Sequence, residues 1–510
     1  MSTTGDSTKQ LDVSGLKLRN SERSINRLPS ELLLRIFGVG DEEQRATRNA
    51  GEPYYGFQDL ITQVCTHWRD VAINAPALWT YIYVSRSPPN HSAALYLDRC
   101  GSTALLDIDL EMTNNFYDEY PDSVNSITSR AKDAIEFLIQ HGAITSRWKS
   151  LLIRSRDSQM LYLALEYVHP QSTPALQYLS VEYSPQVYVI KTIRAENKSE
   201  NNDPSKILPR LRHVELIALP AGFLFEQSLP MLAGLTHLKL SCEFKLYSQG
   251  KLYDMLSANP QLESLDIGGG IIDEDFEPAD RRVVLPSLRL LSIASETSCP
   301  WTLGIMKMIS GPAVEHLKLS YYGYQPDKMV QVIEQIVGHI ASEDSTDASP
   351  VPTHNLALSH RYAYPTLRHL DVSGLHPVHN QTKVFRNLFW VLPTITLLVA
   401  RASLFTVLGD QPGLLPHLER IKLIGKPPEG LSRILHRRAE AGYPVKTFEI
   451  HEQFLGSVYN TLSESLTITA IPGVYYDSDD DFEGLLEGGC GTITCNFGYD
   501  DSGTNSSTEY

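Results

Sequence analysis

The chain repeats one pattern of apolar and polar positions over most of its length. The pattern is apolar-x-x-apolar-x-apolar, as in LRHVEL at 211–216, LTHLKL at 235–240 and LRHLDV at 367–372. Apolar residues that alternate with polar ones are typical of a β-strand with one buried face. Each copy therefore predicts a short strand that buries its leucines and turns the residues between them to the other face.

The copies recur at a nearly constant spacing. They lie at 148–153, 176–181, 211–216, 235–240, 262–267, 288–293, 314–319, 367–372, 395–400, 418–423 and 445–450, and 103–108 is a candidate first copy. From 211 onward the starts are separated by 24, 27, 26, 26, 53, 28, 23 and 27 residues. The step of 53 is two periods and predicts a degenerate or displaced repeat between 320 and 366. A fixed period of this length is typical of a solenoid, whose units bury their apolar faces against neighbours.

Several gaps between the copies carry a helical pattern instead. These segments are 251–260, 301–310, 329–340, 382–392 and 431–442. One strand and one helix per repeat predicts an α/β fold with parallel strands on the inside and helices on the outside. This organisation resembles a leucine-rich-repeat horseshoe with long repeats. The Asn or Cys expected after the strand is replaced by Glu243, Gly270, Glu296 and Tyr322, so no asparagine ladder is expected.

The polar positions beside the central leucine are expected to face the concave side of such a solenoid. They form a candidate substrate surface that includes His237, Lys239, Asp266, His316, Lys318, His369, Asp371, Arg420 and Lys422. A solvent-facing strand needs polar residues in any case, so a binding surface and a plain solvated face both remain open. The set is mixed in charge and does not identify a partner.

Two amphipathic segments precede the repeats. In INRLPSELLLRIF, residues 25–37, the apolar residues recur on one stripe of a helix, and in residues 57–72 they keep helical spacing for over four turns. The polar, glycine-containing stretch 38–56 between them predicts a loop. Two such helices carry more apolar surface than one hairpin can bury. Part of it is therefore expected to face another protein or domain.

The residues of these two helices resemble an F-box motif. The first segment contains Leu-Pro, then a glutamate, then regularly spaced leucines and Ile-Phe. The second segment contains Val-Cys-x-x-Trp-x-x-Val-Ala, followed by Pro-x-Leu-Trp. The resemblance implies docking on the Skp adaptor, and through it on the cullin scaffold, of an SCF-type cullin-RING ubiquitin ligase. It places Leu28, Pro29, Leu32, Ile36, Phe37, Val64, Cys65 and Trp68 at or just behind the adaptor surface. The alternative is an ordinary helical hairpin that packs on the rest of the chain.

Composition and charge narrow the classes of partner that the chain is expected to bind. The 510 residues carry a formal net charge of −16, which argues against nucleic acid because phosphate binding needs a basic stripe. Neither a signal peptide nor a membrane span is expected, since no apolar run is long enough. The six cysteines are scattered, so free thiols and a cytoplasmic or nuclear location are expected.

Motifs for catalysis and metal binding are missing from the sequence. G-x-S-x-G, H-E-x-x-H and G-x-x-x-x-G-K-[ST] do not occur, and the glycines of 266–280 lack dinucleotide-binding spacing because Asp273 replaces the third glycine. The histidines do not cluster, and Cys490 and Cys495 have no second pair. We therefore expect neither an enzyme nor a bound metal or cofactor.

The sequence thus divides into four parts. We predict a disordered segment at 1–23, an F-box-like helical module at 24–84, a leucine-rich-repeat-like solenoid at 85–472 and an acidic, disordered tail at 473–510. The predicted function is the substrate-recognition subunit of an SCF ligase, whose solenoid binds an unknown target protein. A ligase-independent repeat scaffold is the alternative, and an enzyme with an unrecognised site is a third.

Overall fold

The computed structural model describes most of the predicted module and solenoid. The described residues are 23–47, 54, 56–85, 90–112, 124–156, 158–168, 172–183, 208–219, 232–242, 249–269, 281–295, 299–323, 325–342, 364–376, 381–456 and 466–471. The predicted disordered segment 1–23, apart from its last residue, and the whole predicted tail 473–510 lie outside them. Glu243, Gly270 and Glu296 do as well.

Short helices form the N-terminal module. They are η1 (Ser24–Arg27), α2 (Ser30–Thr47), α3 (Phe57–Val64), α4 (Thr66–Ile73) and η2 (Pro76–Trp79). The loop predicted over 38–56 was wrong in its first ten residues, because α2 continues to Thr47. An ion pair between Asp41 and Arg45, four residues apart on the helix, supports this extension.

The second predicted helix is also corrected, because it is broken in two. Cys65 is extended, with φ −160° and ψ 170°, and separates α3 from α4. Its sulfur accepts a hydrogen bond from the backbone N–H of Trp68 at 3.5 Å, so Cys65 acts as the N-cap of α4. Apolar spacing continues through the break, which is why the pattern alone predicts one helix.

Parallel strands alternate with helices along the rest of the described chain. One 14-stranded sheet contains β1 (Tyr81–Val84), β2 (Leu106–Met112), β3 (Trp148–Ser155), β4 (Tyr178–Tyr183), β5 (His213–Ile217), β6 (His237–Cys242), β7 (Ser264–Gly269), β9 (Leu290–Ser295), β11 (His316–Tyr321), β12 (His369–Gly374), β13 (Leu397–Arg401), β14 (Arg420–Ile424), β15 (Thr447–His451) and β16 (Thr467–Ile471), in that order. Because β1 pairs with β2, the sheet begins inside the range 24–84 that was assigned to the helical module. The short strands β8 (Val283–Val284) and β10 (Ile309–Ser310) pair separately.

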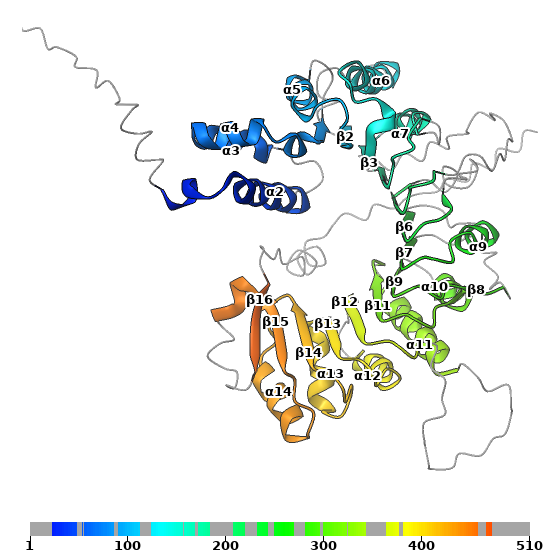
Figure 1. Cartoon of the computed structure of the whole chain (residues 1–510). Helices are drawn as coiled ribbons and strands as arrows, with labels where there is room; N and C mark the ends of the chain where they lie inside the picture. Colours follow the sequence, from blue (N-terminus) through cyan, green and yellow to red (C-terminus); the bar gives the residue numbers. More distant parts are fainter. Residues whose placement is uncertain are drawn as a thin grey trace, which may run out of the picture.

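Helices cover the outer side of the sheet. They are α5 (His91–Cys100), α6 (Val124–Gln140), α7 (Ser158–Glu166), α9 (Gln249–Ser257), α10 (Cys299–Met308), α11 (Pro326–Ser342), α12 (Thr382–Trp390), α13 (Phe405–Asp410) and α14 (Leu431–Glu440). The strands follow the inner side of an arc and the helices its outer side (Figure 1). This confirms the predicted α/β, leucine-rich-repeat-like solenoid that follows N-terminal helices. None of the described helices is both long and apolar enough to cross a membrane.

The repeated leucines build the core between sheet and helices. In register across neighbouring strands, Val214, Leu238, Leu265, Leu291 and Leu317 are all at most 2% exposed. Each such side chain stabilises the fold by roughly 1.5–3 kcal/mol on burial. The alternating pattern therefore determines which face of every strand becomes the core.

The long step in the repeat spacing lies between two strands that are neighbours in the sheet. His316 of β11 pairs directly with His369 of β12, so no strand lies between them in the sheet. Helix α11 occupies 326–342, and residues 343–363 lie outside the described part. The 53-residue step thus separates two adjacent strands, and a degenerate or displaced repeat between 320 and 366 adds no strand between them.

Buried polar side chains hold the turns of neighbouring repeats. Asn259 accepts a hydrogen bond from the backbone N–H of Leu235 at 2.8 Å and donates to the carbonyls of Leu232 and Met255. Arg147 donates to the carbonyls of Ala104, Gly101 and Gly142. These side chains satisfy backbone groups of turns that are buried or partly buried.

Candidate protein-binding surfaces

The N-terminal module exposes an unusual amount of apolar side chain. Its exposed large apolar residues are Ile25, Leu32, Ile36, Val39, Leu60, Val64 and Ile73, with exposed fractions from 38% to 57%. Leu32, Ile36 and Val39 are spaced to share one stripe of α2, and Leu60 and Val64 are spaced to share one stripe of α3. A soluble domain seldom leaves such stripes uncovered unless they bind something.

The eight residues predicted to dock the adaptor fall into an outer and an inner group. Pro29, Leu32, Ile36 and Val64 are exposed, whereas Leu28, Cys65 and Trp68 are half-buried and Phe37 is buried. Phe37 packs on Trp68, with ring centroids 5.0 Å apart. The Trp68 indole N–H donates to Asn26 Oδ1 at 2.7 Å. The inner group therefore holds the helices together beneath the exposed stripes.

Gly40 lets α2 and α3 approach each other closely. A Cβ on Gly40 would lie 2.4 Å from Cζ of Phe57, while a Cβ on Gly38 would meet nothing within 4 Å. We expect Gly40→Ala to lower the free energy of unfolding by about 1–3 kcal/mol through overpacking. Gly38→Ala, the matched control, should be neutral or stabilising because alanine favours a helix. Urea unfolding of both variants checks this, and equal effects would contradict it.

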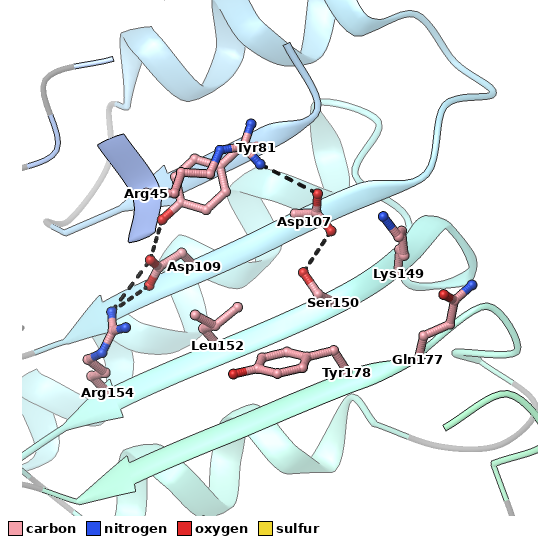
Figure 2. A pocket seen from close by; sticks show the side chains of 10 residues that line it. All are labelled: Arg45, Tyr81, Asp107, Asp109, Lys149, Ser150, Leu152, Arg154, Gln177 and Tyr178. Atoms are coloured by element: carbon pink, nitrogen blue, oxygen red, sulfur yellow. Dashed lines mark hydrogen bonds and ion pairs between the residues drawn. The ribbon is translucent and has the colours of Figure 1, made fainter. Parts of the chain in front are cut away.

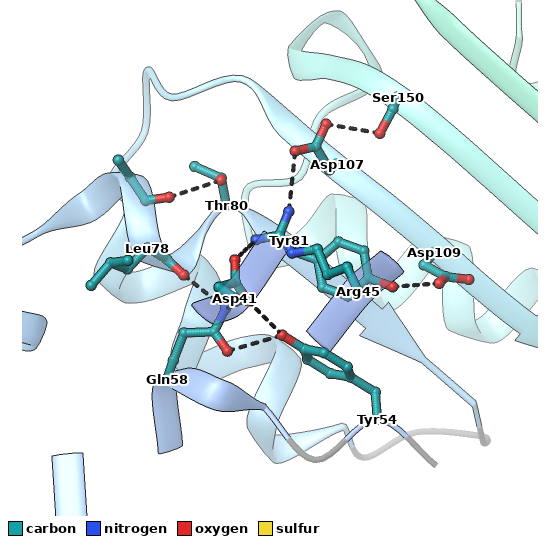
Figure 3. A network of polar contacts seen from close by, with 11 residues as sticks. Asp41, Arg45, Tyr54, Gln58, Leu78, Thr80, Tyr81, Asp107, Asp109 and Ser150 are labelled. Atoms are coloured by element: carbon teal, nitrogen blue, oxygen red, sulfur yellow. Dashed lines mark hydrogen bonds and ion pairs between the residues drawn. The ribbon is translucent and has the colours of Figure 1, made fainter. Parts of the chain in front are cut away.

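A buried polar network joins the module to the sheet (Figure 3). Gln58 Nε2 donates to Asp41 Oδ1 and to the carbonyl of Leu78, both at 2.9 Å. The Tyr54 hydroxyl lies 2.9 Å from Asp41 Oδ1 and 3.0 Å from Gln58 Oε1. Burial, with the nearby Asp41 carboxylate, raises the pKa of Tyr54, so this hydroxyl stays protonated.

Arg45 carries the connection on to the inner face of the sheet. Its guanidinium pairs with Asp41, stacks 4.3 Å from the centroid of the Tyr81 ring and lies 3.7 Å from Asp107. Asp107 in turn accepts a hydrogen bond from Ser150 of β3 at 2.8 Å. The end of α2 is thereby fixed to the first three strands, which argues against a freely hinged module.

The inner face of the first strands contains a hollow of about 360 Å³ (Figure 2). Its lining residues are Arg45, Tyr81, Asp107, Asp109, Lys149, Ser150, Leu152, Arg154, Gln177 and Tyr178. Arg154 pairs with Asp109, Glu111 and Glu182 at 3.2–3.3 Å, and the Tyr81 hydroxyl donates to Asp109 at 2.5 Å. The charged groups of the hollow therefore bind largely to one another.

All nine residues of the predicted substrate surface lie on the inner face. The strand register aligns them in two rows: His237, His316, His369 and Arg420 in one, and Lys239, Asp266, Lys318, Asp371 and Lys422 in the other. They are half-buried or exposed, in contrast to the buried leucines between them. The register brings together residues that are up to 185 positions apart in the chain, from His237 to Lys422.

Along the first of these rows, histidines on adjacent strands form two pairs. The rings of His213 and His237 stack with centroids 5.1 Å apart, and Nδ1 of His316 lies 2.8 Å from Nδ1 of His369. His213 hydrogen-bonds to Glu215 at 3.0 Å and lowers the pKa of that carboxyl. Burial, with His316 and Arg420 nearby, lowers the pKa of His369. Among the described residues, no group of three or more metal-ligating side chains converges.

Sequence reasoning missed the polar network and part of the exposed stripes. Asp41 and Tyr54 fall in the segment interpreted as a loop, and Gln58 gives no signal because a polar residue on a surface helix is ordinary. Val39 and Leu60 are exposed and lie on the same stripes as predicted residues, so helical spacing could have identified both. Strand β1, YIYV, lacks the repeated pattern and was not predicted.

Comparisons with known proteins define the fold no further. No protein-family model matches the chain, and no curated protein matches it. A protein of Bacteroides fragilis solved by a structural genomics consortium is similar at 14% identity, over 65% of this chain and 68% of that one, with a TM-score of 0.25. At that score the likeness adds nothing to the solenoid class defined by the sheet itself.

Proposed function

We propose that the chain is the substrate-recognition subunit of an SCF-type ubiquitin ligase. In this proposal the exposed stripes of α2 and α3 bind the Skp adaptor, and the inner face of the solenoid binds a target protein. The supporting observation is the uncovered apolar surface of Leu32, Ile36 and Val64, at positions where the F-box resemblance expects adaptor contacts. Such a protein would work in the cytoplasm, the nucleus or both.

The mechanism is non-covalent and relies on position. A target held on the inner face would stay at a fixed place relative to the adaptor, because the buried network of Asp41, Arg45 and Gln58 joins module and sheet. Holding two reactants together raises the rate of their reaction without any catalytic side chain. The chain itself would then need no cofactor or metal.

A comparison of adaptor binding by the wild-type chain and its Leu32→Asp variant tests the proposal. We expect the wild-type full chain to co-elute with the Skp adaptor, and Leu32→Asp to weaken binding by more than about thirty-fold, as for a central interface residue. Leu32 is 47% exposed, so the change should leave the fold intact. Leu95→Asp is the matched control, since Leu95 is a helical leucine at 41% exposure in α5.

The second candidate is a repeat scaffold that binds partners without a ligase. It is favoured by the same inner face and by the fixed junction, which would let the N-terminal helices serve as a cap for the sheet. If folded wild type does not bind the adaptor, or if Leu95→Asp weakens binding as much as Leu32→Asp, the scaffold replaces the ligase subunit.

A further inference from the structure

The inner face carries a cluster of cations near its C-terminal end. We define the cationic cluster as Arg420 and Lys422, two residues apart on β14. Arg420 is exposed and Lys422 is half-buried, and in the described part of the chain neither has a carboxylate within ion-pair distance. The nearest acids by register are Glu449, opposite Lys422, and Asp371, two strands away.

The opposite end of the same face has the opposite sign. Strands β2 to β5 place five acids on the inner face, against three cations, Arg45, Lys149 and Arg154. The acids are Asp107, Asp109, Glu111, Glu182 and Glu215. The face is therefore bipolar, and an acidic segment is attracted to the end that holds the cationic cluster.

An acidic segment of this chain follows directly after the last strand. Between 477 and 483 the chain has five acids, Asp477, Asp479, Asp480, Asp481 and Glu483, and residues 473–510 contain no Lys or Arg. The last described residue, Ile471, pairs with His451 on β15. The tail thus starts at the end of the sheet that carries the cationic cluster.

The distances allow the tail to reach the cluster. Strands in a sheet lie about 4.8 Å apart, so β14 is roughly 10 Å from β16. The six residues from Ile471 to Asp477 can span up to about 20 Å. A tether this short also gives the tail a millimolar effective concentration at the cluster, which favours it over a free acidic peptide.

We propose that the acidic tail, through residues 477–483, binds the cationic cluster of Arg420 and Lys422 on the inner face. The tail then covers the C-terminal end of the candidate substrate surface in the free chain. A target would have to displace it with acidic groups of its own. This proposal does not depend on adaptor binding and holds equally for a repeat scaffold.

A labelled synthetic peptide of residues 473–489 tests the proposal. The receptor is the full chain in which Asp477, Asp479, Asp480, Asp481 and Glu483 are changed to amides, so that its own tail is neutral. We expect this chain to bind the peptide at least tenfold more tightly than the wild-type chain, whose own tail competes. Binding should weaken several-fold between 50 and 300 mM NaCl because charges drive it.

Charge reversal locates the site. In the tail-neutral chain, Arg420→Glu with Lys422→Glu should weaken peptide binding more than tenfold, and the milder Arg420→Gln with Lys422→Gln should weaken it less. Arg433→Glu with Arg437→Glu is the matched control, because these exposed arginines of α14 belong to the same repeat but lie on its outer side. The control should stay within twofold of the parent.

Three results would overturn the proposal. They are the absence of saturable binding to the tail-neutral chain, equal binding to the tail-neutral and wild-type chains, and equal losses in the two charge-reversed variants. The last result would mean that the peptide responds only to overall charge. Thermal melting of each variant shows whether it is folded, and the glutamine pair keeps the comparison valid if the glutamate pair is not.

Discussion

Replacing Arg438 with methionine is expected to be among the most destabilising single changes in the solenoid. Arg438 is fully buried on α14, and its guanidinium donates to the carbonyls of Pro412 at 2.8 Å, Leu414 at 2.7 Å and Leu415 at 3.1 Å. Leu415 adopts φ +51°, a conformation that side chains other than glycine rarely take. The arginine therefore stabilises a strained turn of the preceding repeat.

The cost of Arg438→Met follows from the groups left behind. Three carbonyls, of which those of Leu414 and Leu415 are buried, lose their donors, and each unsatisfied buried group costs about 1–3 kcal/mol. Part of this is offset, because burial already lowers the pKa of Arg438 to about 10 and so opposes its charge. We expect the free energy of unfolding to fall by about 3–5 kcal/mol, measured by urea unfolding.

The neighbouring arginine supplies the control for this change. Arg437 is exposed on the same helix, so Arg437→Met should change stability by less than about 0.5 kcal/mol. Arg438→Lys should be intermediate, since one ammonium cannot reach all three carbonyls. If Arg438→Met and Arg437→Met unfold at the same urea concentration, the turn at 412–415 does not depend on the guanidinium.

The strands of the fold could be predicted because the repeat pattern encodes burial directly. Each copy from 176–181 onward contains the start of one strand, as LTHLKL contains the start of β6 and LERIKL the start of β14. Apolar residues two apart must face the core together, and a parallel register then aligns copy with copy. The pattern does not show which copies are adjacent in the sheet, so it did not predict that β11 pairs directly with β12 across the 53-residue step.

The candidate surfaces could be predicted only in part, for a physical reason. Which strand residues leave the core follows from periodicity, so Lys239 on β6 was placed on the inner face from spacing alone. Leu32 on α2 was placed at a surface only by the F-box resemblance, because spacing puts it on one stripe with the buried Phe37. Contacts between distant segments do not follow from periodicity. The network of Asp41, Gln58 and Arg45 joins residues of α2 and α3 to the sheet. The sequence next to a polar residue does not show whether the fold will bury it.

The charges on the inner face relate the two candidate surfaces to each other. The exposed stripes of α2 and α3 lie at the N-terminal end of the arc, and the cationic cluster lies near its C-terminal end (Figure 1). The inner face has an excess of acids on strands β2 to β5, is mixed in charge on the middle strands and carries Arg420 and Lys422 on β14. A partner with complementary charges would therefore bind in one orientation relative to the N-terminal helices. That orientation is retained only if the helices are fixed to the sheet.

Changing Asp41 to alanine is expected to break this junction. Asp41 is 3% exposed and is hydrogen-bonded or paired to Arg45, Tyr54 and Gln58. Its removal leaves a guanidinium and two buried polar groups without their carboxylate, and breaking such a buried pair costs about 3–5 kcal/mol. Because the loss falls at the junction, we expect the helices of 30–73 to unfold before the sheet.

Hydrogen exchange distinguishes this local effect from general destabilisation. In Asp41→Ala, amides of α2, α3 and α4 should lose protection, while amides of β6 to β15 should keep the wild-type rate. Glu42→Ala, which removes the same charge from an exposed position of the same helix, should leave both sets unchanged. If Asp41→Ala instead unfolds module and sheet in one transition, the two form a single cooperative unit. The helices are then part of the solenoid core, and a partner bound to them and one bound to the inner face would still be held in a fixed relation.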